Sequence, residues 1–255
     1  MDLTTPLTRF TNTEIESLER ATLDAVAPAC MEERDSWLIP LDETTIGRAK
    51  SAVPLRHDNI AIADINAIEN RYQARGLPAA FRIADVAGLA PIHAELRRLG
   101  YAAQQPTLFL TGKLEDMRSI CHNQPATVSV LPTPAWSEVY LSDGFDPIDG
   151  AHRVQALSRS RHVVYACVQE AGHSVAAGTA SLNHGWVGIH GMRTLPSHRK
   201  RGLAKRVLAG LADSALSRNL TRVYLQVEEE NQAALGLYHR AGFQTAWLYH
   251  YWRKV

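Results

Sequence analysis

A basic run that leads directly into a glycine is the clearest sign of chemistry in this sequence. Arg199-Lys200-Arg201-Gly202 follows a predicted strand over 186–194 and opens a predicted helix over 201–217. A helix that begins this way presents unpaired backbone N–H groups and the positive end of its dipole, which suits a phosphate. Gly202 allows close approach of a ligand to the backbone, and the basic side chains add charge for a diphosphate. The alternative is a solvated basic loop that only caps the helix.

A second informative segment follows the predicted strand over 222–227. Asn231 stands at the start of a predicted helix over 232–241, where its amide either caps the helix or contacts a ligand. Tyr238 lies seven residues further, on the same helical face. A phenol with an ordinary pKa near 10 can donate a proton to a developing thiolate. A core tyrosine with a satisfied hydroxyl is the other interpretation.

Composition excludes several classes of function. The 255 residues include 27 Lys and Arg against 26 Asp and Glu, so no net field favours nucleic acid or an anionic membrane as a partner. Cys30, Cys121 and Cys167 form no CxxC pair, which argues against a disulfide scaffold and a zinc site, and no metal is expected. Residues 1–6 lack signal-peptide features and no apolar run reaches membrane-spanning length, so we predict a soluble cytoplasmic protein. Neither GxGxxG nor GxxxxGK[ST] is present, which leaves Rossmann and Walker sites without support.

The elements that must position these residues predict an α/β fold with a mixed sheet. The second half reads strand, strand, strand, helix, strand, helix, strand, which requires helices on the faces of a sheet. In the first half, Thr13 and Glu16 predict a capping box at the start of a helix, and 37–41 and 45–53 predict strands. The polar segment 111–124 is predicted to be a linker between two domains.

The second half also repeats features of the first. The segment Leu96–Tyr101 resembles Tyr238–Phe243, because each ends a predicted helix in glycine and an aromatic residue and then begins a strand. The two glycines, Gly100 and Gly242, are separated by 142 residues (242 − 100). Two unrelated α/β units would share such features as well, and this remains the competing explanation.

The two polar segments together resemble the GNAT superfamily of acyl-CoA-dependent N-acetyltransferases. Arg199-x-x-Gly202-x-Ala204 matches the family signature Arg/Gln-x-x-Gly-x-Gly/Ala, and Asn231 to Phe243 matches Asn-x-x-Ala-x-x-Leu-Tyr-x-x-x-Gly-Phe in full. The close resemblance covers about 161–255. Within the superfamily, the sequence of this segment is similar to that of a bacterial group with two GNAT-like halves. It implies a degenerate GNAT-like domain over 1–120 and a catalytic GNAT domain over 125–255.

The resemblance places one active site in each chain. At the phosphate-loop position of the first half, Arg56-x-x-Asn59-x-Ala61 lacks the glycine. Leu89 stands where the second half has Asn231, and Leu96 stands opposite Tyr238. The first half is therefore expected to pack against the second and to shape the acceptor pocket.

For the second half, the resemblance implies acetyl-CoA as co-substrate between two splayed parallel strands. One strand pairs its backbone with the pantetheine arm, the loop N–H groups receive the diphosphate, and Tyr238 acts as the acid toward the CoA thiolate. The implied acetyl-CoA-binding residues are Met192, Thr194, Arg199, Lys200, Arg201, Gly202, Leu203, Ala204, Asn231 and Tyr238.

The acceptor amine must lose a proton before it attacks the thioester. His190 is the predicted base, because it precedes Met192 by two residues and its ordinary pKa lies near neutrality. Glu228 at the end of the opposing strand, acting through water, is the alternative. A structural histidine and a solvated acidic run over 228–230 are the competing readings of these residues.

The predicted function is transfer of acetyl from acetyl-CoA to a primary amine of a small molecule or peptide, by direct attack in a ternary complex. A non-catalytic acyl-CoA sensor or assembly module is the alternative, and an acyl group longer than acetyl stays open. Binding of nucleic acid by His198–Arg201 is disfavoured by the near-neutral net charge. Neither a nucleic acid nor a membrane is expected as a partner, and the chain is expected to be a monomer or homodimer.

Overall fold

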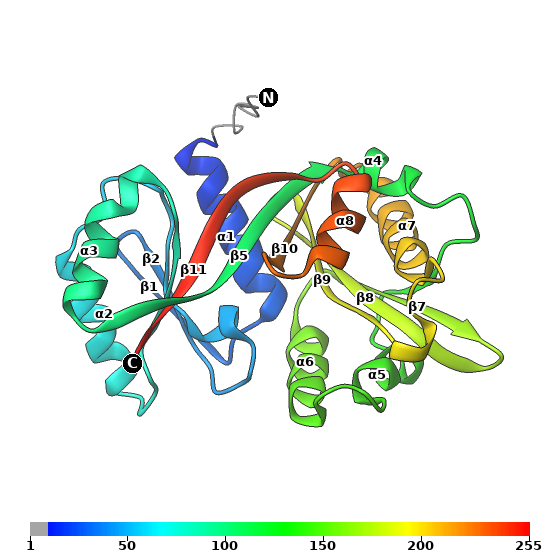
Figure 1. Cartoon of the computed structure of the whole chain (residues 1–255), viewed down its shortest axis with the longest axis horizontal. Coiled ribbons are helices and arrows are strands. Elements are labelled where there is room, and N and C mark those ends of the chain that lie inside the picture. The colour runs from blue at the N-terminus through cyan, green and yellow to red at the C-terminus, as the bar shows by residue number, and fades with distance from the viewer. Residues whose placement is uncertain (1–9) are drawn as a thin grey trace.

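A mixed sheet of eight strands runs through both halves of the chain, in the order β4-β11-β5-β10-β9-β8-β7-β6 (Figure 1). The computed structural model describes residues 10–255, so the segment 1–6, on which the absence of a signal peptide was predicted, lies outside the described residues. The strands of the large sheet are β4 (Ala80–Ala84), β5 (Tyr101–Lys113), β6 (Thr127–Ser129), β7 (Val163–Glu170), β8 (His173–Asn183), β9 (Trp186–Thr194), β10 (Arg222–Glu228) and β11 (Gln244–Lys254). The predicted α/β fold with a mixed sheet is confirmed.

Helices cover this sheet, and a small antiparallel sheet of three strands lies beside it. The small sheet consists of β1 (Cys30–Arg34), β2 (Trp37–Leu41) and β3 (Val53–Pro54). The α-helices are α1 (Asn12–Val26), α2 (Ala63–Gln73), α3 (Ala90–Arg98), α4 (Leu114–Ser119), α5 (Pro134–Leu141), α6 (Pro147–Arg159), α7 (Leu203–Leu216) and α8 (Gln232–Arg240), with 3₁₀ turns η1 (Gly47–Lys50), η2 (Ala87–Leu89) and η3 (Pro196–His198). Among residues 10–255 no helix is both long and apolar enough to span a membrane.

The two halves exchange their last strands. Strand β5 of the first half lies between β10 and β11 and is antiparallel to both, while β11 of the second half also pairs with β4. Figure 1 shows β5 and β11 as the two long strands that cross from one lobe to the other. Gly100 and Gly242, the glycines of the predicted repeat, both have positive φ and both precede an exchanged strand. The repeat therefore corresponds to two equivalent units that complete each other's sheet.

One hydrophobic core crosses the boundary between the halves. Helix α1 packs on β8 and β9, and its Leu18 belongs to the same buried cluster as Tyr224 of β10 and Trp247 of β11. On the opposite side α7 contacts β7, β8 and β9 through a second buried cluster. The sheet that carries the predicted site is thus held between a helix of the first half and a helix of the second.

Three local predictions for the first half are wrong. The capping box is formed by Thr11 and Glu14, two residues earlier than predicted, and the N–H of Glu14 donates to Thr11 Oγ1 at 3.3 Å. Residues 45–53 form η1 and the start of β3 instead of one strand. Gly47 packs closely against the Tyr251 ring, and Ser51 Oγ donates a hydrogen bond to the Gly47 carbonyl, which stabilises the 3₁₀ turn.

The predicted linker 111–124 is likewise wrong, since it contains the end of β5 and all of α4. Leu114 and Met117 are fully buried under α7, and Arg118 forms an ion pair with Asp213 of that helix. Two apolar side chains three residues apart are enough to fix one helical turn against a neighbour, although they are too few to stand out in a polar sequence.

The buried ion pair between Arg82 of β4 and Glu19 of α1 ties this helix to the sheet. The two side chains are 1% and 2% exposed, so removal of one partner leaves an uncompensated charge in the core. We expect Arg82→Met to lower the free energy of unfolding by about 3–5 kcal/mol, measured by urea denaturation. Arg98→Met, which breaks the exposed pair with Glu95, is the control and should cost far less. Equal losses in the two variants would contradict this account.

Candidate active site

Strands β9 and β10 run parallel and separate part-way along their length. Their pairing begins at Val187 with Val223 and ends at Ile189 with Leu225. Beyond this point a cavity of about 400 Å³ opens between them, lined by residues 189–193 of β9 and 225–228 of β10. The backbone of β9 in this stretch is paired with β8 on one side only. Its free edge is therefore available to the amide groups of a ligand.

A β-bulge at Gly191 bends β9 where the cavity begins. The register with β8 shifts by one residue there, and Gly191 adopts a φ of +62°. A Cβ at this position would lie 2.7 Å from the hydroxyl oxygen of Tyr140, which donates a 2.6 Å hydrogen bond to the Gly191 carbonyl. Only glycine fits this conformation and this contact, so the sequence encodes the bend of the strand at this residue.

The structure brings five of the predicted site residues to this cavity. They are His190, Met192, Glu228, Asn231 and Tyr238. Thr194 and the loop 199–204 lie further along the chain from β9 to α7 and do not line the cavity. The predicted residues therefore form two adjoining groups, one around the cavity and one at the start of α7.

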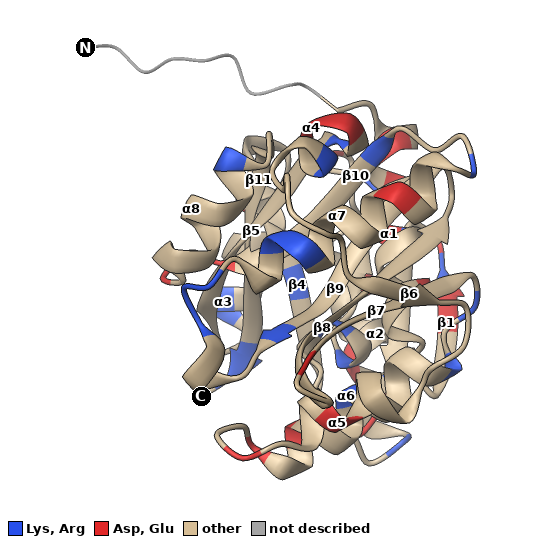
Figure 2. Cartoon of the chain, turned by 90° about the vertical axis from the view of Figure 1, so that its right-hand side faces the viewer, with Lys and Arg blue, Asp and Glu red and all other residues tan. Residues whose placement is uncertain are grey.

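The loop before α7 presents an open helix N-terminus. Gly202 is the N-cap residue with a φ of +79°, and a Cβ placed on it would meet no atom within 4 Å. The first N–H groups of α7 have no acceptor within the helix, and Figure 2 shows basic residues on the segment that leads into it. The guanidinium of Arg201 is already engaged by Glu170 at 2.8 Å, whereas Arg199 and Lys200 are exposed. Charge for a phosphate thus comes from these two side chains and from the backbone.

Tyr238 on α8 faces the cavity from a buried position. Its side chain is 8% exposed, and its ring meets Phe243 edge to face at 5.8 Å. Burial raises the pKa of Tyr238 to about 12. The phenol is therefore protonated at neutral pH and can act only as a proton donor toward a group that becomes negative in the cavity.

His190 is more deeply buried than its predicted role suggested. It is 4% exposed, its Nε2 lies 3.5 Å from the hydroxyl of Tyr224, and its Nδ1 has no hydrogen-bond partner among residues 10–255. Burial, with the positive charge of Arg48 adding to it, holds the pKa of His190 well below its ordinary value. The imidazole is consequently neutral at pH 7.

Glu228 and Asn231 occupy the mouth of the cavity. Glu228 is partly buried at the end of β10 and accepts a 2.7 Å hydrogen bond from Gln105 Nε2. Asn231 caps α8 by accepting from the N–H of Ala234 at 3.1 Å. Its carbonyl oxygen is thereby used in the cap, and its amide N–H₂ is the group left for a ligand.

Sequence reasoning missed the residues that the first half and β11 contribute to the cavity. They are Thr45, Ile46, Gly47, Arg48, Gln105, Thr107, Tyr249, Tyr251 and Arg253. They come from an irregular loop and from the exchanged strands, and no local pattern in the sequence marks them. Tyr249 and Tyr251 lie within the segment 161–255 that resembles the GNAT superfamily, but no role was predicted for either.

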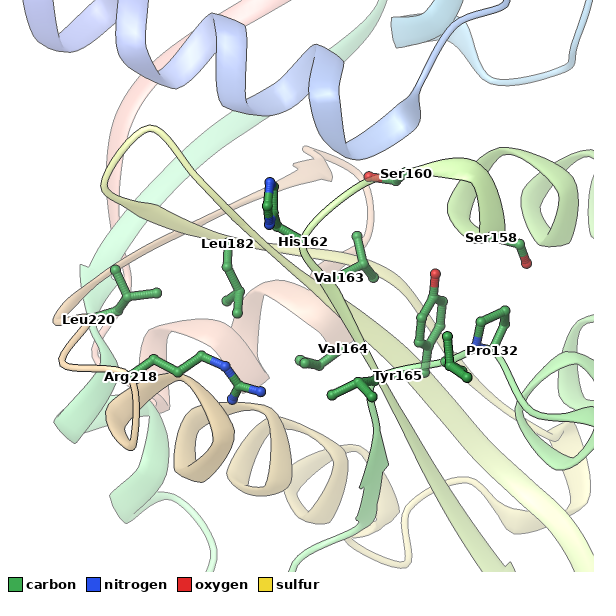
Figure 3. A pocket seen from close by; sticks show the side chains of 12 residues that line it. Pro132, Ser158, Ser160, His162, Val163, Val164, Tyr165, Leu182, Arg218 and Leu220 are labelled. Carbon is green, nitrogen blue, oxygen red and sulfur yellow. The ribbon is translucent and has the colours of Figure 1, made fainter.

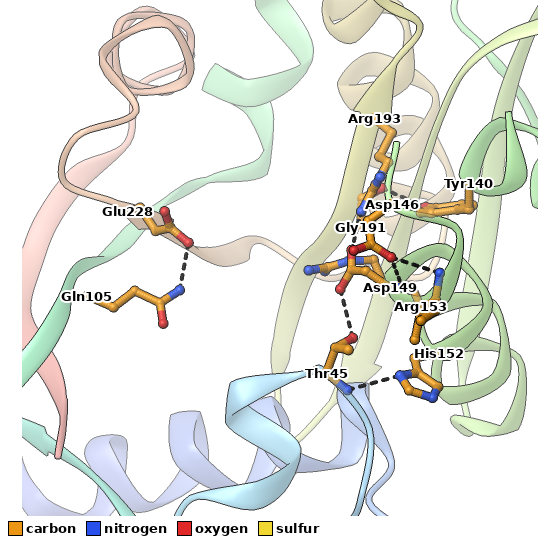
Figure 4. Close-up of polar contacts among 11 residues, drawn as sticks. Thr45, Gln105, Tyr140, Asp146, Asp149, His152, Arg153, Gly191, Arg193 and Glu228 are labelled. Carbon is orange, nitrogen blue, oxygen red and sulfur yellow. Dashed lines mark hydrogen bonds and ion pairs between the residues drawn. The ribbon is translucent and has the colours of Figure 1, made fainter. Parts of the chain in front are cut away.

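A polar network fixes the loop of the first half against α6, as Figure 4 shows. Thr45 Oγ1 donates to Asp149 at 2.8 Å, and the N–H of Thr45 donates to His152 Nδ1 at 3.1 Å. Asp149 also pairs with Arg153 and Arg193. Although burial opposes it, these hydrogen bonds and charges lower the pKa of Asp149. The ionised carboxylate thus joins the first half, α6 and β9 in one arrangement beside the cavity.

At the position of the phosphate loop, the first half has the segment 56–61, in which Arg56, Asn59 and Ala61 are exposed and the backbone and ring of His57 pack against neighbouring residues. The ring of His57 lies edge-on to Trp247 at 4.9 Å, and its carbonyl oxygen would lie 2.1 Å from a Cβ at Gly88. Asn59 takes the positive φ that Gly202 has in the second half. The loss of phosphate binding by the first half stays a prediction.

A second cavity, of about 510 Å³, lies between β7 and the end of α7 (Figure 3). Its lining includes His162, Val164, Leu182 and Arg218. It contains none of the predicted site residues. Among residues 10–255 there is also no group of three or more His, Cys, Asp or Glu side chains placed to hold a metal ion.

Comparison with known proteins identifies the family to which the chain belongs. Residues 12–252 match the protein-family model described as the C-terminal part of the probable histone acetyltransferase Rv0428c. The chain belongs to this family, within the GNAT acetyltransferases. YobR of Bacillus subtilis strain 168, an uncharacterized N-acetyltransferase, is 34% identical over 76 residues, or 30% of this chain and 31% of that relative. This match spans about a third of the relative's length.

Solved GNAT structures share the whole fold. A GCN5-related N-acetyltransferase from Kribbella flavida superposes with a TM-score of 0.70 at 14% identity, covering 94% of this chain and 95% of its own. A tandem GNAT protein from the clavulanic acid biosynthesis pathway gives a TM-score of 0.61 at 11% identity, covering 93% and 94%. The predicted arrangement of two GNAT-like units in tandem is thereby confirmed, whereas the domain boundaries at 120 and 125 and the roles of the site residues stay predictions.

Proposed function

We propose that this GNAT protein transfers the acetyl group of acetyl-CoA to a primary amine by direct attack in a ternary complex. The observation that carries the proposal is the separation of β9 from β10 beside an open helix N-terminus, with Tyr238 and Glu228 facing the resulting cavity. The cavity, with the free backbone edge of β9, suits the pantetheine end of acetyl-CoA. The free N–H groups at the start of α7 suit its diphosphate end.

The chemical groups of these residues match the groups that acetyl-CoA would present to them. The free backbone edge of β9 at Met192 and Thr194 offers the donors and acceptors that pantetheine amides require. The N–H groups of Arg201, Gly202, Leu203 and Ala204 suit a diphosphate. Arg199 and Lys200 lie beside them, and the amide N–H₂ of Asn231 is free to meet the pantetheine or a water.

Acetyl-CoA supplies an acetyl group activated as a thioester. The amine nitrogen forms a bond to the thioester carbonyl carbon, the C–S bond breaks, and the electron pair leaves on sulfur. Tyr238 gives its phenolic proton to this sulfur, and the amine proton passes to a base. A second proton transfer through solvent restores both groups, so that the products are the amide and CoA.

Glu228 is better suited than His190 to receive the amine proton. Protonation of Glu228 neutralises a charge at the cavity mouth, and its carboxylate attracts an ammonium ion beforehand. Protonation of His190 would create a cation in a buried site that already feels the charge of Arg48. His190 therefore forms the neutral wall of the cavity in this proposal and remains the second candidate for the base.

The test is calorimetric titration of the full chain with acetyl-CoA, followed by thiol-release assays on a panel of amines. We expect one saturable site in each chain and turnover of at least one amine class. Because the matched family model is described as a probable histone acetyltransferase, the panel includes a lysine-containing peptide beside small amines. Binding without turnover of any amine would instead favour a non-catalytic acyl-CoA sensor, and absence of binding would refute the proposal.

A further inference from the structure

The cavity between β9 and β10 contains an unbalanced positive charge. Four guanidinium groups line it, and Glu228 is the one carboxylate among its lining residues. Arg153 and Arg193 share the single carboxylate of Asp149 as their ion-pair partner. The cavity therefore holds more positive charge than its own acidic residues balance.

Two of these guanidinium groups have no carboxylate partner within residues 10–255. Arg253 is hydrogen-bonded to the side-chain oxygens of Gln104 and Gln105 at 3.2 and 3.4 Å and lies over the ring of Tyr251. Arg48 has no hydrogen bond or ion pair to any residue that the structure describes, and its Nε is buried without a partner. Arg48 is thus the cation of the cavity whose donors are unused.

Arg48 reaches the cavity from the first half and is held there by its surroundings. It lies on η1, directly after the Thr45 anchor to Asp149 and His152. Its charge depresses the pKa of His190 and opposes the effect of burial on the pKa of Tyr249, so the guanidinium lies near both side chains. The charge of Arg48 also acts on the buried carboxylate of Glu19, which is already paired with Arg82. No carboxylate among residues 10–255 therefore forms an ion pair with Arg48.

We propose that Arg48 binds a carboxylate of the acceptor, so that the substrate is an amine that also carries a carboxylate, such as an amino acid. A partly buried guanidinium with unused N–H groups is stabilised by a ligand that accepts two parallel hydrogen bonds, which a carboxylate does. Glu228 attracts the ammonium end of the same molecule, and the opposite charges of Arg48 and Glu228 orient it. The pantetheine arm is uncharged and therefore does not neutralise Arg48. This inference rests on the proposed acetyltransferase function.

The experiment compares amino acids with the amines that result from their decarboxylation. Wild-type protein, Arg48→Met and Arg48→Lys are assayed for thiol release with lysine against cadaverine, phenylalanine against phenethylamine, and phosphoethanolamine against ethanolamine. We expect wild type to favour the carboxylate member of the first two pairs and to show no preference for phosphoethanolamine over ethanolamine. Arg48→Met should lower kcat/KM for the two amino acids by about thirtyfold or more. The KM for acetyl-CoA should not change, and Arg48→Lys should restore part of the loss. Arg56→Met, which removes an exposed guanidinium bonded to Ser36, is the matched control.

A binding measurement keeps this inference separate from the proposed function. The CoA-loaded protein is titrated calorimetrically with N-acetyllysine and with N-acetylcadaverine, which requires no catalysis. Tighter binding of the carboxylate ligand that is lost in Arg48→Met supports the inference even where no amine is turned over. Equal binding of the two ligands, or a preference unaffected by Arg48→Met, overturns it while leaving the acetyltransferase proposal intact. A preference for phosphoethanolamine alone overturns the carboxylate assignment.

Discussion

Gly202→Glu is expected to abolish acetyl-CoA binding while the chain stays folded. A Cβ at this position meets no protein atom within 4 Å, so the side chain projects into the open space before α7. In our proposal this space receives the diphosphate, and a carboxylate there would repel it and occupy its volume. We expect affinity measured by calorimetry to fall on the order of 100-fold or more, since several charge-assisted hydrogen bonds are lost together.

Two further variants separate this effect from backbone strain. Gly202→Ala imposes the same positive φ on a non-glycine residue without adding charge, and it should weaken binding only slightly. Gly76→Glu places the same side chain at a second open glycine of φ +67°, remote from the cavity, and should leave binding unchanged. Wild-type affinity in Gly202→Glu would show that the phosphate groups are bound elsewhere.

The parts of the site that sequence could predict are contiguous in the chain. Arg199–Ala204 and Asn231–Phe243 each contain a loop and the helix that follows, so residue type and spacing were enough to place them on the correct elements. The exposed Gly202 lies at the start of a helix and the buried Tyr238 lies within a helix, as their local sequence predicted. The same holds for Gly100 and Gly242, whose positive φ ends a helix in each half.

The remaining parts depend on contacts between distant segments. The exchange of β5 and β11 could not be predicted, because hydrophobic alternation shows that a segment is a strand but does not show which strand it pairs with. Arg48 was missed for a related reason. Its environment is created by β9, β10 and β11, more than 130 residues away in the chain (186 − 48), and the burial of His190 arises from the same packing.

These distant contacts give the degenerate half a direct part in the site. Its strand β5 completes the sheet next to β10, its Gln105 binds Glu228, and its η1 carries Arg48. A first half that had served only as a packing partner would not need to place polar side chains at the cavity. The predicted loss of phosphate binding in the first half is therefore compatible with our proposal that this half helps to bind the acceptor.

Tyr238→Phe is expected to lower kcat by roughly 10²- to 10³-fold with little change in affinity for acetyl-CoA. The substitution removes only the hydroxyl, and the ring can keep its contact with Phe243. Without the phenolic proton the thiolate has to leave unprotonated or take a proton from water, which raises the barrier for breaking the C–S bond. Thiol-release kinetics with a saturating amine, together with calorimetry, measure the two quantities separately.

The pH dependence of kcat gives an independent check on this role. Burial raises the pKa of Tyr238 to about 12, so the phenol stays protonated and competent up to pH 10, and its ionisation should cause no fall in kcat below that value. A falling limb with a midpoint near 9 would mean that a different acid is in use. Tyr72→Phe, which removes a buried hydroxyl bonded to the Pro40 carbonyl, controls for loss of stability alone and should leave kcat unchanged. An unchanged rate in Tyr238→Phe would assign proton donation to water and leave the tyrosine as a wall of the cavity.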